Sequence, residues 1–285
     1  MLLDLLRARL HQGHRTSRFP DEEPALPTRF RGRPALDGAR CRDGCRACIA
    51  SCPTQALTAG PGPLALDLGR CLFCADCVDA CPEGAITFTQ DFRLAERARA
   101  RLVARSAGAA DPGERALALS GELRRLFGRS LKLRVVSAGG CNGCEADVNV
   151  LGTVVFDLGR FGIQYVASPR HADGLLVTGP VTANMREALR RTYDAVPEPR
   201  IVIAVGACAI SGGPYVDHAE AHGGADSTVP VDLYVPGCPP HPFTILEGLI
   251  GLLGRGGHAG GARPAGLTGP ASPTGPTGPT DGAAP

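Results

Sequence analysis

The sequence predicts an α/β fold with two domains, and three observations support this. Residues 130–255 alternate short β-rich runs with helical ones, which is typical of a largely parallel sheet covered by helices. Residues 36–91 hold eight of the twelve cysteines in one dense block, which indicates a separate and smaller α+β domain. At 285 residues the chain is also long enough to bury two cores.

Outside these domains the composition changes. Apolar residues recur with helical spacing near the start, so an amphipathic docking helix is expected within an arm of residues 1–35. Residues 92–129 are rich in Ala, Leu, Arg and Glu and are broken at Asp111-Pro112-Gly113, which predicts a linker of two helices with a solvated arginine-rich face. The Gly- and Pro-rich residues 256–285 are expected to be disordered.

The larger domain contains five β-rich and three helical runs. Because helices join the β-rich runs, a parallel sheet of the flavodoxin-like kind is expected. The predicted strands are 131–136, 163–168, 174–179, 201–205 and 231–235, and the predicted helices are 145–157, 182–194 and 242–254.

Charge and hydropathy exclude several classes of function. The formal net charge is +2 and 20% of the residues are charged, so no nucleic-acid partner is expected. No apolar run reaches the roughly 18 to 20 residues that span a bilayer, so no direct membrane span is expected. Twelve cysteines in a chain that shows no secretory signal predict metal binding rather than disulfides.

Eight cysteines form two matching runs, "CRDGCRACIASCP" from Cys41 and "CLFCADCVDACP" from Cys71. The second run has the spacing of bacterial ferredoxins, in which three thiolates bind one 4Fe-4S cluster and the fourth binds the other. This ferredoxin-like pattern assigns Cys71, Cys74, Cys77 and Cys52 to one cluster, and Cys41, Cys45, Cys48 and Cys81 to the second. The first run has one extra residue, which Gly44 is expected to absorb. Paired zinc sites are the alternative.

Four cysteines remain after this assignment: Cys141, Cys144, Cys208 and Cys238. They lie in three loops that follow predicted strands, and the carboxyl ends of parallel strands share one edge of a sheet. Glycines flank these loops and permit close approach of the backbone to sulfur. The four thiols are therefore expected to hold a third 4Fe-4S cluster, with buried apolar cysteines or a structural zinc site as alternatives.

The stretches "CNGCEADV", "GACAISGG" and "VPGCPPHP" resemble the electron-transferring small subunit of energy-converting nickel-iron hydrogenases of the formate hydrogenlyase type, and its B-type relative in NADH:quinone oxidoreductase (complex I). Residues 14–90 resemble the polyferredoxin subunit of the same complexes, so the chain resembles a fusion of the two. Cys141 and Cys144 are separated by two residues, whereas the complex I relative has adjacent cysteines there. This spacing favours the hydrogenase branch.

The resemblance implies an iron-sulfur electron-transfer subunit of an oxidoreductase complex, with no complete active site in this chain. Electrons would pass between two ferredoxin-type clusters and a proximal cluster beside the active site of a partner large subunit. A quinone-reducing, complex I-like module is the first alternative, and a metal-stabilised scaffold without electron transfer is the second. The expected location is cytoplasmic and peripheral to the membrane, through partner subunits.

Two acidic residues follow the first cysteine pair. Glu145 and Asp147 stand where relatives carry acidic residues linked to proton movement, so the resemblance implies a proton relay. Equally, acids in the first turn of a helix favour its positive end. The histidines have no competing ligand spacing and are expected in loops or in the core: His171, His218, His222, His241 and His258.

Overall fold

The structure is a computed structural model and describes residues 2–59, 64–106, 119, 121–127 and 130–255. The larger domain is built on a five-stranded sheet in the order β10-β9-β8-β6-β7. Every neighbouring pair in it is parallel, as the alternating pattern predicted. The strands are β6 (Leu131–Ser137), β7 (Ile163–Tyr165), β8 (Gly174–Thr178), β9 (Ile201–Val205) and β10 (Leu233–Val235).

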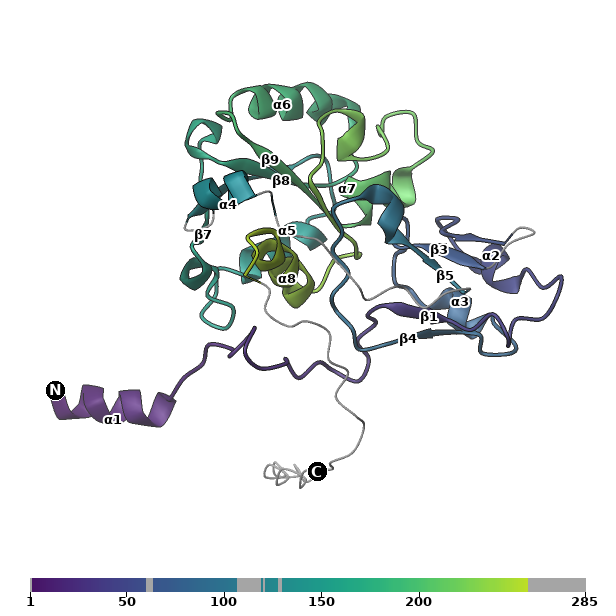
Figure 1. The fold of residues 1–285 in the computed structure, drawn as a ribbon, viewed down its shortest axis with the longest axis horizontal. Helices are drawn as coiled ribbons and strands as arrows, with labels where there is room; N and C mark the ends of the chain where they lie inside the picture. Colours follow the sequence, from purple (N-terminus) through teal and green to yellow (C-terminus); the bar gives the residue numbers. More distant parts are fainter. Residues whose placement is uncertain (1, 60–63, 107–118, 120, 128–129, 256–285) are drawn as a thin grey trace, which may run out of the picture.

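Helices cover both faces of this sheet (Figure 1). Leu175 of β8 packs in one cluster with Leu189 of α6 (Ala183–Asp194) and Ile210 of α7 (Ala207–Ser211). The next residue, Leu176, packs on the opposite face with α5 (Gly143–Val150) and α8 (Pro242–Leu252). Successive strand side chains point to opposite faces, so a continuously apolar strand is buried from both sides. The expected helix over 145–157 is shorter than predicted and ends at Val150.

The smaller domain contains two antiparallel sheets. β1 (Pro34–Leu36) pairs with β4 (Ile86–Phe88). The second sheet has the order β2-β3-β5, and two short helices that carry cysteines pack together beside the sheets. Its strands are β2 (Leu57–Thr58), β3 (Ala65–Asp67) and β5 (Val103–Arg105), and the helices are α2 (Ala47–Ser51) and α3 (Asp76–Asp79).

The first half of the expected helical linker is not an α-helix, and this prediction was wrong. Its chain runs extended through a 3-10 turn, η1 (Arg99–Leu102), into β5, which completes the three-stranded sheet. Phe92, Leu94 and Leu102 are buried, so tertiary packing outweighs the helix propensity of this composition. Its arginines do not form a solvated helix face either, because Arg99 pairs with Asp67.

The second half of the linker contains the helix α4 (Gly121–Phe127). The expected break at Asp111-Pro112-Gly113 and the expected disordered tail lie outside the described residues. The remaining short elements are 3-10 turns: η2 (Leu158–Phe161), η3 (Pro169–His171), η4 (Gly213–Tyr215) and η5 (Ala225–Ser227).

The two domains are joined by a continuous interface. Ser211 of α7 donates its hydroxyl to the carbonyl of Gly69 at 2.9 Å. Glu96 and Tyr234 exchange backbone hydrogen bonds of 3.0 and 2.8 Å, which pairs the linker with β10 at the edge of the large sheet. One apolar cluster runs from the cysteine-rich domain to α7 and the sheet. These contacts fix the position of the cysteines of the smaller domain relative to those of the large domain.

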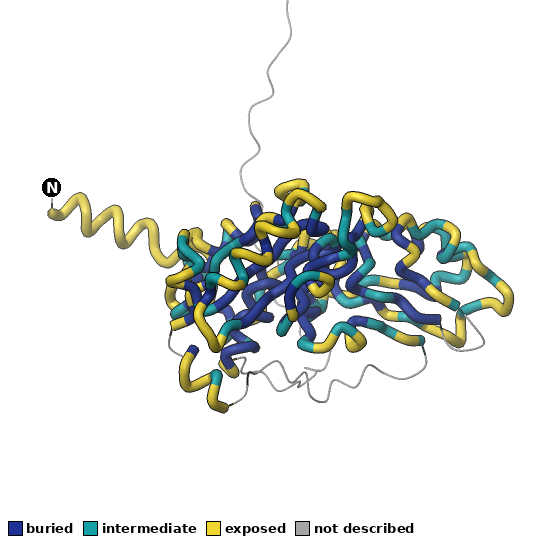
Figure 2. The backbone as a smooth tube through the Cα atoms, turned by 90° about the horizontal axis from the view of Figure 1, so that it is seen from above, coloured by how far each residue is buried: buried dark blue, intermediate teal, exposed yellow. Residues whose placement is uncertain are grey.

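The N-terminal arm crosses the large domain after a helix, α1 (Leu2–Gln12), that stands away from the body (Figure 2). Phe19 is buried among aromatic rings, 5.8 Å from Phe92 and 5.3 Å from Phe243 between centroids. Arg160 donates to the carbonyls of Ser17 and Phe19 at 2.8 and 2.7 Å. Within the described ranges, no helix is long and apolar enough to cross a membrane.

Candidate metal centre

The four distant cysteines meet at the carboxyl edge of the large sheet. Cys141 follows β6, Cys208 lies in α7 after β9, and Cys238 follows β10. Burial raises the pKa of Cys144, and the negative charges of Cys208, Cys238 and Cys141 raise it further. Burial raises the pKa of Cys208 to about 11, again with contributions from Cys238 and Cys141. Each thiol therefore lies within electrostatic reach of the others.

Two glycines make room for the sulfur atoms at this edge. Gly206 has φ +92°, and a Cβ there would lie 2.4 Å from the Sγ of Cys144. A Cβ on Gly213, at φ +54°, would lie 3.0 Å from the Sγ of Cys208. Only glycine combines this backbone conformation with such a close approach, so the edge is shaped around sulfur.

In the cysteine-rich domain the thiols of each run also lie within electrostatic reach of thiols from the other run. Burial raises the pKa of Cys71 to about 12 and that of Cys77 to about 11, and the charges of Cys52 and Cys74 contribute to both. Burial also raises the pKa of Cys48, with contributions from three cysteines of the other predicted set. These are Cys81, Cys41 and Cys45.

The two cysteine runs present backbone N–H groups to sulfur in the same way. Ala56 donates its N–H to the Sγ of Cys52 at 3.2 Å, and Ala85 donates to the Sγ of Cys81 at 3.2 Å. In each case the preceding residue is left-handed, with φ 52° at Gln55 and 58° at Gly84. N–H donors aimed at thiolates stabilise their negative charge and are a main determinant of cluster potential, so these loops fit 4Fe-4S clusters.

The extra residue in the first run coincides with a left-handed turn at Gly44, where φ is +74° and a Cβ would meet open space. The second run takes left-handed φ at two non-glycine residues instead, 55° at Phe73 and 75° at Ala75. Gly44 thus occupies the turn at which the additional residue was expected to be absorbed.

No three His, Cys, Asp or Glu side chains in the described part of the chain converge on one point as the ligands of a single metal ion do. In a cubane each of the four thiolates binds a different iron atom, so its ligands lie farther apart than those of one ion. Within each predicted set, the charges of other members raise the pKa of at least one thiol.

Glu145 lies buried beside the sheet-edge thiols. Its Oε1 accepts hydrogen bonds from Ser137 Oγ at 2.5 Å and from Thr178 Oγ1 at 2.7 Å, while Oε2 is buried with no hydrogen-bond partner among the described residues. Burial acts to raise the pKa of this carboxyl, but the two hydroxyls outweigh it and leave the pKa lowered. The carboxylate is thereby kept charged next to Cys144.

Two residues of this site, Ser137 and Thr178, were not expected from the sequence. They end neighbouring parallel strands, β6 and β8. The carboxyl ends of parallel strands lie at one edge of the sheet, where ligands bind. Polar residues at the ends of the predicted strands, such as Ser137 and Thr178, could therefore have been expected at the same edge as the cysteines.

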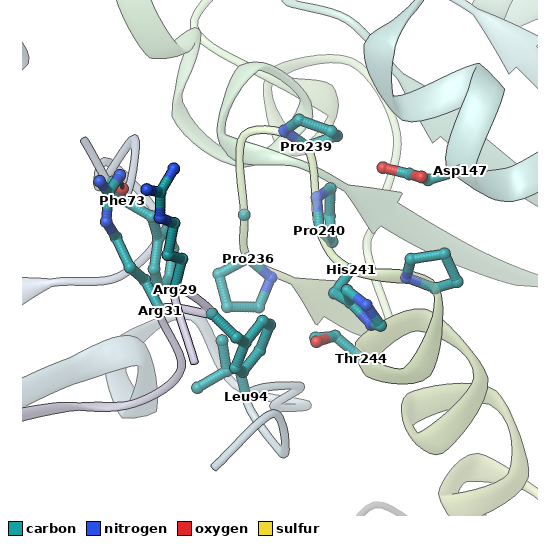
Figure 3. Close-up of a pocket in the computed structure, with 13 residues that line it drawn as sticks. Arg29, Arg31, Phe73, Leu94, Asp147, Pro236, Pro239, Pro240, His241 and Thr244 are labelled. Carbon is teal, nitrogen blue, oxygen red and sulfur yellow. Dashed lines mark hydrogen bonds between the residues drawn. The ribbon is translucent and has the colours of Figure 1, made fainter. Parts of the chain in front are cut away.

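A cavity of about 330 Å³ lies between Phe73, the residue before Cys74, and Gly237 and Pro239, which flank Cys238 (Figure 3). Arg29, Arg31 and Phe73 line one side, and Asp147 of α5 lies on the other (Figure 3). Arg31 donates to the carbonyl of Phe73 at 2.7 Å, directly before Cys74. Burial raises the pKa of Asp147, whereas the pKa of Glu145 is lowered. The two acids therefore lie in different electrostatic environments.

Of the histidines expected in loops or in the core, His218 and His222 lie in loops and His171 ends the 3-10 turn η3. His241 accepts the N–H of Phe243 on Nδ1 at 3.2 Å and so caps α8. His218 accepts the N–H of Glu220 on Nδ1 at 3.1 Å within its loop. His258 lies outside the described residues.

Comparison with known proteins identifies both parts of the chain. Residues 141–252 match the family model described as NADH ubiquinone oxidoreductase, 20 Kd subunit, and residues 40–86 match a 4Fe-4S dicluster domain. The probable membrane-bound hydrogenase subunit mbhJ of Pyrococcus furiosus is 43% identical over 129 residues, which cover 45% of this chain and 77% of that protein. This chain belongs to the 20 kDa-subunit family.

Two further relatives of the family come from different complexes. Formate hydrogenlyase subunit 7 of Escherichia coli is 46% identical over 130 residues, covering 46% of this chain and 51% of that protein. The B-type subunit of the NADH-quinone oxidoreductase of Clostridium beijerinckii is 44% identical over 108 residues, covering 38% of this chain and 64% of that protein. The resemblance to hydrogenase and complex I subunits is confirmed, and the match to a dicluster domain supports iron-sulfur binding.

Proposed function

We propose that this chain is the iron-sulfur electron-transfer subunit of a hydrogenase-like oxidoreductase complex, with the active site in a partner large subunit. The observation behind this proposal is that four distant cysteines meet at one edge of the large sheet and the other eight stand in two matching runs, with none left over. Bound to these groups, three 4Fe-4S clusters would supply one-electron transfer. The hydrogenase subunits among its relatives support this role.

The groups follow one another through the molecule. Phe73, which precedes Cys74, lines the same cavity as Gly237 and Pro239, which flank Cys238, so we expect the sheet edge to adjoin the group that contains Cys74. The helix α2, which carries Cys48, packs against α3, which carries Cys77, so we expect that group to adjoin the remaining one. Electrons would thus pass between the sheet edge and the group with Cys48 by way of the group with Cys74.

The fold supports the position of the first of these groups. When the strands of the large sheet are numbered along the chain, their spatial order is 2-1-3-4-5, the order of flavodoxin-like sheets. Such sheets bind ligands where the strand order reverses, here between β6 and β8. Cys141 leaves the sheet at this point, so a flavodoxin-like domain would hold a cluster there. The paired cysteine runs equally support a ferredoxin-like smaller domain.

Cys141 and Cys238 are exposed at the sheet edge, which suits a surface that the large subunit covers. The chain would then belong to a membrane-associated complex as a peripheral subunit, held there by its partner subunits. Two hydrogenase relatives, one of them described as membrane-bound, support this assembly.

The two acids beside this edge are assigned different parts in proton movement. Asp147, whose pKa is raised, lines the open cavity and can exchange a proton with it. Glu145 is held as a carboxylate by Ser137 and Thr178, so we assign it a fixed negative charge beside the thiols rather than a mobile proton. Replacing Asp147 with Asn should slow turnover of the complex and leave the iron content unchanged. Unchanged turnover would remove the relay role and leave the acid as a residue of α5.

Anaerobic purification tests the proposal directly. Iron and acid-labile sulfide should each approach about twelve per chain. Each of the variants Cys45→Ser, Cys74→Ser and Cys238→Ser should lose one cluster and keep about eight irons. Zinc in place of iron, or a Cys238→Ser variant with full iron, would overturn it.

A second function is favoured by the relative from NADH-quinone oxidoreductase. In a quinone-reducing complex the same chain would carry electrons toward quinone. The partner large subunit distinguishes the two, because nickel binding requires two Cys-x2-Cys pairs there. A co-purified large subunit that lacks these pairs and contains no nickel would favour quinone reduction.

A further inference from the structure

The helix α1 exposes an apolar face that the rest of the described chain leaves uncovered. None of its residues is buried. Its five leucines, at positions 2, 3, 5, 6 and 10, are between 53% and 83% exposed. Figures 1 and 2 both show the helix standing clear of the two domains. Five exposed leucines on one short helix form a contiguous apolar patch, and such a patch marks a surface that binds a protein or a membrane.

Basic residues accompany these leucines. Residues 2–15 contain three arginines and a single acidic residue, Asp4. At 100° per residue, Arg7 falls at the edge of the leucine face and His11 falls opposite it, whereas Arg9 falls within the apolar face, one turn after Leu5. The helix is therefore amphipathic and cationic, with one cation inside its apolar stripe.

The arginine in the stripe distinguishes two possible surfaces. A closed protein groove would have to bury Arg9 and supply an acidic partner for it. At a bilayer surface, the aliphatic stem of an arginine lies along the apolar layer while its guanidinium reaches the phosphates. A cationic helix of low overall hydrophobicity with leucines on one face is typical of helices that lie in the membrane interface.

The attachment of α1 to the body indicates which side would face the bilayer. Only residues 13–16 separate the helix from Ser17, whose N–H donates to the carbonyl of Val155 at 2.8 Å. Val154 and Val155 are 63% and 42% exposed. Four residues span at most about 14 Å, so the helix and this pair of valines can meet the same surface.

We propose that α1 is an interfacial helix that binds anionic lipid bilayers directly, with its leucines in the acyl boundary and its arginines at the headgroups. The side of the molecule that carries Val154 and Val155 then faces the membrane. This gives the chain a membrane contact of its own, in addition to any contact made through partner subunits. It does not depend on the clusters.

The absence of tryptophan from the sequence permits a clean optical test. Leu6→Trp places a single indole on the apolar face, and His11→Trp places one on the polar face. With the full-length anaerobic protein and vesicles containing phosphatidylglycerol, the emission of Leu6→Trp should shift to shorter wavelength. That of His11→Trp should change much less. Equal responses of the two variants would contradict insertion by this face.

Flotation with vesicles measures the binding itself. Leu5→Glu combined with Leu6→Glu should reduce the bound fraction at least tenfold, because two leucines no longer leave water. Arg7→Gln combined with Arg15→Gln should weaken binding about thirtyfold to anionic vesicles. Leu126→Glu, a substitution of a leucine on α4 that is 56% exposed, is the matched control and should bind as the parent does.

Three results would overturn the proposal. If the parent chain fails to float with anionic vesicles while Leu5→Glu still prevents assembly with the large subunit, α1 is a protein-docking helix. If the parent is a dimer that Leu5→Glu converts to a monomer, a second copy is the occupant. Equal binding to anionic and zwitterionic vesicles would remove the role of the arginines.

Discussion

The cysteine-rich domain and the sheet edge gather thiols over different distances along the chain. In the cysteine-rich domain the eight thiols come from two short runs, from Cys41 to Cys52 and from Cys71 to Cys81. The sheet edge draws its thiols from Cys141 to Cys238, across most of the large domain. Short loops can hold ligands through their own backbone, whereas the edge can hold them only when the whole sheet is folded.

The contacts around sulfur reflect this difference. In the cysteine-rich domain, backbone N–H groups of Ala56 and Ala85 donate to thiols four residues earlier. At the sheet edge the close neighbours of sulfur come from distant segments, as Gly206 does for Cys144. A substitution at the edge should therefore affect a cluster through packing, and one in a cysteine run through local geometry.

The largest effect is expected from Gly206→Ala. Its Cβ would lie 2.4 Å from the Sγ of Cys144 at a φ of +92°, so the thiol must move. The sheet-edge cluster should be lost and iron should fall from about twelve to about eight per chain. Iron and sulfide analysis with electron paramagnetic resonance measures this.

Gly44→Ala is the matched control in a cysteine run. Gly44 also has positive φ, +74°, but a Cβ there would meet open space. The substitution should cost about 1 kcal/mol of stability and keep all clusters. If Gly44→Ala lost a cluster and Gly206→Ala did not, the contrast between the two regions would be wrong.

An intermediate effect is expected from Thr178→Val, which removes one hydroxyl from Glu145 at the sheet edge. Thr178 is fully buried and donates at 2.7 Å, so the carboxylate keeps only Ser137 as a side-chain donor among the described residues. The free energy of unfolding should fall by about 2 kcal/mol. Anaerobic denaturant titration measures it, with the exposed Thr87→Val as a control that should change by less than about 0.5 kcal/mol.

A smaller effect is expected where the smaller sheet meets the linker. Arg99 donates to both carboxylate oxygens of Asp67, at 2.8 and 2.6 Å, and both side chains are largely buried. Arg99→Met should lower stability by about 1 kcal/mol without loss of iron. The exposed pair of Arg191 and Glu187 serves for comparison, and Arg191→Met should have almost no effect.

The smallest effect concerns the pH dependence of stability. Because burial raises the folded-state pKa of Asp147, its protonated form favours folding. That contribution is present below the unfolded pKa and is lost as pH rises through the folded pKa. Asp147→Asn should therefore be slightly more stable than the parent at pH 8, and the difference should vanish toward pH 4. A parent that loses more stability than the variant on acidification from pH 8 to pH 5 would contradict the sign.

Local patterns in the chain were enough to predict the element types of the large domain and the family, and both predictions were confirmed. Five β-rich runs and helices at 182–194 and 242–254 were confirmed because their apolar residues recur with a fixed period, and periodicity is a local property. The spacing of the cysteine runs is equally local. The assignment of each thiol to a cluster stays a prediction.

Segments whose apolar residues show no clear periodicity take their structure from long-range contacts instead. The chain from Phe92 to Arg105 has helix-favouring composition, yet it joins a sheet, because burial of Phe92 and Leu102 outweighs propensities of a fraction of a kcal/mol per residue. The position of Cys74 near Cys238 likewise depends on the packing of the two domains, because residues next to both cysteines line one cavity. No local pattern encodes such contacts, since they exist only once the two domains have packed together.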